Sequence, residues 1–133
     1  MAFYRTREGA ITASDSWTSL GSLYGQSTTA SVQLPKQSSS IVGIIASVSS
    51  DSATNGATTF AVQLSGDGLN NGQETFTIGS QGVDGTPASN GMTNLPFKLD
   101  VAIPVTGSNQ VSISGAMDTD IGSVSMAVTL VLA

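Results

Sequence analysis

The sequence predicts an all-β protein, an antiparallel β-sandwich of about eight strands. Apolar residues alternate with polar ones along several short segments, as they do in strands that bury one face. Turn-forming residues separate these segments, and none of them has a 3.6-residue apolar period over the length of a helix. At 133 residues, the chain has the size of one domain that can bury a core.

Eight segments carry the strand pattern, and turn-forming residues bound them. Most of them are expected to bury every second residue, and the last one, 122–133, has the clearest alternation. Residues 41–49 are almost continuously apolar, which predicts a strand buried on both faces. In chain order, the segments are marked by residues 17–24; Val32 and Leu34; 41–49; Phe60, Val62 and Leu64; Phe76 and Ile78; Leu99, Val101, Ile103 and Val105; Val111 and Ile113; and Val124, Met126, Val128, Leu130 and Leu132.

The connections refine this topology. Pro104 lies inside a strand pattern, so that strand is expected to be an edge strand or to end there. Residues 80–96 form the one long irregular segment, and connections of this length are often functional or disordered. Eight strands with one long connection favour a jelly roll, with an immunoglobulin-like sandwich as the alternative.

Two regions of the chain are expected to differ in organisation. Residues 1–10 are predicted to form an N-terminal arm, and residues 11–133 a single β-sandwich domain. The arm would wrap a neighbouring subunit and pair its arginines with an acidic body, whereas a frayed terminus is the alternative. The predicted partner-binding residues are Phe3, Tyr4, Arg5 and Arg7.

Charge and hydropathy limit the classes of partner. The net charge is −5, and only Lys36 and Lys98 are basic beyond the first ten residues. Direct nucleic-acid binding needs a basic face, so nucleic acid is not an expected partner. No apolar run is long enough to span a bilayer, and no secretory signal is visible, which indicates a protein made inside a cell.

Serine and threonine take the place of charged residues, which make up only 10% of the chain. These short side chains lose little rotamer entropy when a contact immobilises them, so the composition favours a surface that assembles with others. Secreted and salt-tolerant proteins have a similar composition.

The residues that most enzymes rely on are scarce in this sequence, which contains neither histidine nor cysteine. These two residue types supply most general bases near neutral pH and most thiolate nucleophiles. A serine nucleophile would have to use Lys36 or Lys98, and Glu74 is the only glutamate beyond the arm. We therefore expect no enzyme activity, no catalytic residue and no cofactor.

One segment has the oxygen ligands that calcium prefers. Asp67, Asn70, Asn71 and Glu74 lie within a short Gly-rich stretch, although their spacing does not match an EF-hand. A polar hairpin turn explains the same residues.

The aromatic residues allow a different function. Trp17 and Tyr24 would make a small stacking platform for a sugar, as in a carbohydrate-binding β-sandwich module. A buried Trp17 is the competing interpretation. A subunit of an extracellular fibre or surface layer is a further alternative, for which the sequence shows no export signal.

The whole chain resembles the small jelly-roll proteins of virus particles, above all the decoration (cement) proteins on the capsids of tailed phages. The resemblance rests on length, the polar-aromatic N-terminal segment, the Ser/Thr-rich strands and the hydrophobic last strand. No motif of fixed spacing carries it.

This resemblance implies a homo-oligomer, a trimer, that sits on a shell and ties the major capsid protein together. The protein would be part of a virion and made in the host cytoplasm. Small capsid subunits with a single jelly roll share the profile. The arm and residues 80–96 would reach the shell or a neighbouring subunit.

Overall fold

The computed structural model describes residues 2–23, 26–50, 56–83 and 96–133, and none of these residues is helical. No helix that could span a membrane is therefore found in the described ranges. The strands are β1 (Phe3–Ile11), β2 (Thr18–Ser19), β3 (Ser22–Leu23), β4 (Gln26–Ser27), β5 (Ser31–Gln33), β6 (Ser40–Ser50), β7 (Gly56–Ser65), β8 (Gln73–Val83), β9 (Pro96–Pro104), β10 (Gln110–Met117) and β11 (Val124–Leu132).

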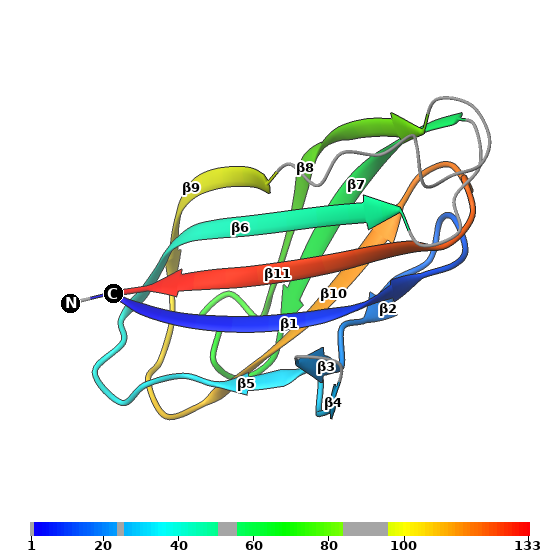
Figure 1. Cartoon of the computed structure of the whole chain (residues 1–133). Helices are drawn as coiled ribbons and strands as arrows, with labels where there is room; N and C mark the ends of the chain where they lie inside the picture. The colour runs from blue at the N-terminus through cyan, green and yellow to red at the C-terminus, as the bar shows by residue number, and fades with distance from the viewer. Residues whose placement is uncertain (1, 24–25, 51–55, 84–95) are drawn as a thin grey trace.

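The strands form two antiparallel sheets that pack face to face (Figure 1). The first sheet has the order β4-β3-β1-β11-β6-β9, and the second has the order β2-β10-β7-β8, with β5 also paired to β10. Since β2 and β5 both pair with β10, they share one strand position. If β3 and β4 are left out and the remaining strand positions are numbered 1 to 8 in chain order, the first sheet has the order 1-8-3-6 and the second has the order 2-7-4-5. This is the jelly-roll order. The jelly-roll prediction is confirmed.

The predicted N-terminal arm coincides with a strand inside the first sheet. In the structure, Phe3 lies opposite Leu132 and Ile11 lies opposite Val124, so β1 pairs with β11 along its full length. The two ends of the chain therefore lie together (Figure 1). The sequence pattern concealed this strand because Arg5 and Arg7 occupy positions on its inward face, where apolar residues are expected.

The core lies between the sheets and is built from the alternating residues that the sequence predicts. Every second residue of β11 is buried, and the same alternation holds in β7 and β10. The largest fully buried side chains are Phe60, Ile11, Leu20, Leu34, Ile41, Ile44, Leu64, Ile113, Met117, Met126, Leu130 and Leu132.

The prediction that residues 41–49 are buried on both faces is wrong. Val42 is 39% exposed, and Ile45 is only half-buried. A β-bulge between Ile41 and Gly43 shifts the alternation, so that Ile41 and Ile44 both face the core. The apolar run therefore arises because the bulge shifts the alternation of inward and outward residues, and the outer face of β6 stays accessible.

The edges of the sheets follow the expected chemistry. β9 is an edge strand of the first sheet and ends at Pro104, as predicted. Proline has no backbone N–H group with which to continue the hydrogen bonding of the sheet. Of the long segment predicted over residues 80–96, residues 84–95 lie outside the described part of the chain.

Candidate assembly and ligand-binding surfaces

Two arginines of β1 hydrogen-bond to the backbone of β5 and of the residues just before it. Arg5 Nε donates to the carbonyl of Gln33 at 3.1 Å. Arg7 donates through Nε to the carbonyl of Thr29 at 2.9 Å and through Nη2 to that of Ser31 at 3.2 Å. The other side of β5 pairs with β10. The guanidinium groups thus cover a strand edge that could otherwise pair with another chain.

The four predicted partner-binding residues lie in different environments. Phe3 packs against the core, and the guanidinium groups of Arg5 and Arg7 are bound within the chain. Tyr4 is 60% exposed, because it lies on the outward face of β1. A partner-binding role for this segment stays a prediction, and Tyr4 is the side chain best placed for it.

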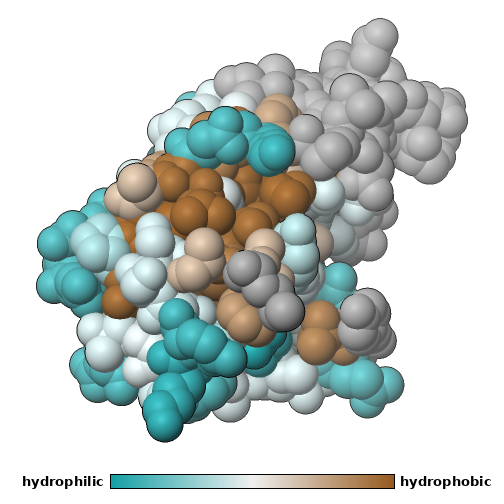
Figure 2. Space-filling view, turned by 90° about the vertical axis from the view of Figure 1, so that its left-hand side faces the viewer, coloured by the Kyte–Doolittle hydropathy of each residue, from teal (hydrophilic) through white to brown (hydrophobic). Residues whose placement is uncertain are grey.

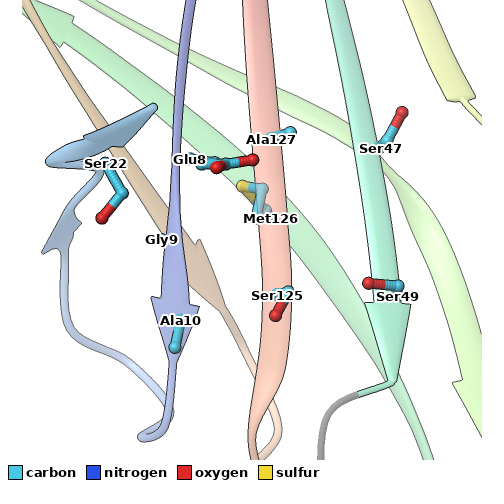
Figure 3. A pocket seen from close by; sticks show the side chains of 9 residues that line it. All are labelled: Glu8, Gly9, Ala10, Ser22, Ser47, Ser49, Ser125, Met126 and Ala127. Atoms are coloured by element: carbon cyan, nitrogen blue, oxygen red, sulfur yellow. The ribbon is translucent and has the colours of Figure 1, made fainter. Parts of the chain in front are cut away.

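The outer face of β1, β11 and β6 has a shallow depression at one end. Sheet pairing places short side chains from the three strands next to one another. Figure 3 shows the carboxylate of Glu8 extending over β11 toward Ala127. The surface is hollowed by about 390 Å³, with a lining of Glu8, Gly9, Ala10, Ser22, Ser47, Ser49, Ser125, Met126 and Ala127.

The same face changes character toward the termini. Thr6 and Thr129 share a hydrogen bond of 2.9 Å between their hydroxyl groups at the middle of the face. Beyond them, Tyr4 lies beside Val131, and Val42 lies at the bulge of β6. Figure 2 views the molecule from this end and shows apolar side chains gathered there. We call the small-residue depression, the threonine pair and this apolar end together the outer β1–β11–β6 face.

Of the candidate calcium ligands, Asp67, Asn70 and Asn71 lie in the connection between β7 and β8, and Glu74 is the second residue of β8. Asn71 Nδ2 donates to Glu74 Oε1 at 3.0 Å, and Thr106 Oγ1 donates to Asn70 Oδ1 at 2.9 Å. Asp67 is exposed, and no group of three acidic residues that could hold a metal occurs in the described ranges. These contacts tie the connection to the neighbouring segment, and a polar turn without bound metal stays the prediction, which calorimetric titration with calcium would test.

Glycines permit the tight path of this connection. Gly66 and Gly72 have φ values of +120° and +83°, which side-chain-bearing residues rarely adopt. A Cβ atom on Gly66 would also lie 2.8 Å from the carbonyl oxygen of Gln110. The turn predicted from the Gly-rich composition is therefore enforced by backbone conformation and by close packing.

The interpretation of Trp17 as a buried residue is wrong, since its side chain is 42% exposed. Trp17 precedes β2, a two-residue strand at the edge of the second sheet, and it lies on the outer surface rather than between the sheets. Tyr24, its predicted partner in a platform, lies outside the described residues. The indole lines a hollow of about 370 Å³ with Asp15, Ser16, Thr59, Ala61, Thr77, Ala116, Met117 and Asp118.

Asp118 is held in a fixed position at this hollow. Its Oδ1 accepts a hydrogen bond from the backbone N–H of Thr59 at 2.9 Å and one from Thr58 Oγ1 at 3.0 Å. Thr58 Oγ1 in turn accepts from the backbone N–H of Thr119. The sequence pattern gives no sign of this network, because Thr58 and Asp118 are 60 positions apart and only the sheets bring them together.

These hydrogen bonds make stability dependent on pH. The N–H of Thr59, and then the hydroxyl of Thr58, lower the pKa of Asp118 below its ordinary value of 3.8. Because the folded-state pKa is the lower one, the carboxylate stabilises the fold above pH 3.8. This contribution is lost as the pH falls through the folded-state pKa.

Replacement of Asp118 by asparagine is expected to remove this pH dependence, since an amide oxygen accepts the same bonds but does not titrate. Urea unfolding of both proteins at several pH values measures the effect. The stability advantage of the wild type should shrink below pH 3.8. An advantage that stays constant with pH would contradict the assignment.

Comparison with known proteins agrees with the architecture. No protein-family model matches the sequence, and no curated protein matches it. The VP2 subviral particle of infectious bursal disease virus superposes with a TM-score of 0.52 and 13% identity over 99% of this chain and 32% of VP2. Dimeric latent PorU from Porphyromonas gingivalis gives a TM-score of 0.52 and 14% identity over 98% of this chain and 12% of PorU.

The chain therefore spans about a third of VP2 and about an eighth of PorU. At these identities, the likeness establishes a shared β-sandwich fold. One of these structures is a viral particle protein and the other is bacterial, so function has to be argued from the surfaces of this chain.

Proposed function

We propose that this chain is a structural protein of a virus particle, a decoration (cement) protein or a small capsid subunit that stabilises a shell through contacts between subunits. The observation that carries this proposal is the outer β1–β11–β6 face. Its small hydroxyl and methyl groups have little side-chain entropy to lose on contact, and its apolar end supplies surface to bury. The jelly-roll order of the strands supports the same proposal.

The proposed partners are further copies of this chain, as a trimer, and a major capsid protein. In this arrangement, the depression near Ser125 receives a side chain or backbone of a neighbour, because the row formed by Ala10, Ser125 and Ser49 carries only short side chains. The protein would reside in the virion after synthesis in the host cytoplasm.

Substitution of Ser125 by arginine should prevent self-assembly without unfolding the domain. Ser125 is exposed in the centre of the depression, so a long charged side chain fits on the isolated chain but not under a tightly packed neighbour. Size-exclusion chromatography with light scattering should give about three times the 13.4 kDa monomer mass for the wild type and the monomer mass for the variant.

Replacement of Thr75 by arginine is the matched control. Thr75 is exposed on β8, in the other sheet, and its substitution should leave the wild-type mass unchanged. A monomeric wild type, or a Ser125→Arg variant that assembles normally, would argue against this face as the interface. Open-ended polymers would favour the fibre or surface-layer alternative.

A further inference from the structure

The hollow at Trp17 is a groove across the strands of the second sheet. Sheet pairing aligns Ala116 of β10, Ala61 of β7 and Thr77 of β8 in one row across the sheet. The two alanines keep the floor low, and the three strands extend it over about 10 Å. Trp17 stands at the β10 side of this row. The volume of about 370 Å³ falls within the range of small-molecule sites.

The loop that carries Trp17 is fixed to the sheet. The backbone N–H of Asp15 donates to the carbonyl of Met117 at 2.9 Å, and Asp15 has a φ of +57°. Asp118 is held across from this loop by Thr58 and Thr59. Since the backbone of the loop before Trp17 and the Asp118 carboxylate are both held in place, less ordering entropy would be lost when a ligand binds.

From this geometry we infer that the groove binds a neutral saccharide. A pyranose ring presents C–H groups that pack on the exposed face of Trp17, and its hydroxyl groups donate to the carboxylate of Asp118. This inference is independent of the proposed role in a shell, because the groove and the outer β1–β11–β6 face lie on different sheets.

The polar groups of the groove distinguish a saccharide from a cation. The carboxylates of Asp15 and Asp118 beside an indole would also attract a guanidinium or ammonium group. However, the hydroxyl groups of Ser16 and Thr77 can donate as well as accept. A cation offers them no acceptor, whereas a sugar hydroxyl both donates and accepts. The mixed set of groups therefore favours the uncharged polyol.

Intrinsic fluorescence tests this inference directly, because Trp17 is the only tryptophan of the chain. Glucose, galactose, mannose, N-acetylglucosamine and their β-linked disaccharides are titrated to tens of millimolar, with free arginine as the cationic competitor. We expect a saturable change with at least one saccharide and none with arginine. Absence of saturation with every saccharide, or saturation with arginine alone, would overturn the inference.

Calorimetry with the responsive saccharide then locates the site. Trp17→Ala is expected to weaken binding about tenfold or more, and Thr77→Val several-fold, because one removes the stacking surface and the other a hydroxyl group. Tyr4→Ala removes an exposed aromatic from the other sheet and is expected to bind like the wild type. Unchanged binding by both Trp17→Ala and Thr77→Val would place the saccharide elsewhere and overturn the inference.

The assembly variant separates the two proposals. Ser125→Arg should lose self-association while it keeps the saccharide affinity of the wild type. Loss of saccharide binding in a folded Ser125→Arg variant would contradict the assignment to the Trp17 groove.

Discussion

Removal of residues 2–8 is expected to prevent the chain from folding. These residues make up most of β1, which lies between β3 and β11 inside the first sheet. Their loss would leave the backbone of β11 unpaired on one side from Ala127 to Leu132 and expose buried residues such as Leu130 and Leu132. We expect the loss of free energy to exceed the roughly 5–15 kcal/mol by which typical domains are stable.

Circular dichroism and urea unfolding of the truncated chain measure this effect. A cooperative transition close to that of the full chain would contradict it, and residues 2–8 would then act as the detachable arm that the sequence pattern predicts. The double variant Arg5→Met/Arg7→Met is the control. It keeps the β1–β11 pairing and removes the arginine hydrogen bonds to β5, to the residues just before it, and to the carbonyls of Tyr4 and Thr6, so it should fold with a loss of about 1–3 kcal/mol.

Replacement of Phe60 by alanine is expected to lower the free energy of unfolding by about 3–5 kcal/mol. Phe60 is fully buried in β7, where it lies opposite Met117 on one side and Gly79 on the other. Neighbouring strands hold these groups in place, so the space left by the ring can close only in part. For a chain of this length, the melting temperature should fall by roughly 10–20 °C.

Phe76→Ala is the matched control in the adjacent strand. Phe76 packs against the core but is only partly buried, so its truncation removes less apolar surface from the fold and should cost about 1–2 kcal/mol. Differential scanning calorimetry of both variants compares them. Equal losses for the two substitutions would contradict the position of Phe60 at the centre of the core.

Most of the main strands were predictable because their signal is local. In β7, β10 and β11, the alternation of apolar and polar residues records burial on one face, and it needs no knowledge of the partner strand. Pro104 likewise marks the end of β9 through its own missing N–H group. A strand could therefore be predicted wherever its burial pattern did not depend on the identity of its partner strand.

Where a pattern depended on a distant partner, the prediction failed. β1 has arginines on its inward face, and they are accommodated because they donate to backbone carbonyls in and just before β5. The bulge at Ile41–Gly43 changes which residues of β6 face the core, and the isolated Gly43 within the apolar run was its one local signal. Trp17 is exposed because the short β2 pairs at the edge of a sheet with residues almost a hundred positions later.

The all-β class, the positions of the long strands and most of the core could be predicted from the sequence alone, since a period of two residues follows from local burial. The surfaces that could serve a function became visible only in the folded chain. The outer β1–β11–β6 face and the Trp17 groove each combine strands from distant parts of the chain. Their shape depends on which strands pair and in which register. Both depend on residues of several strands together, so neither can be predicted from one segment alone.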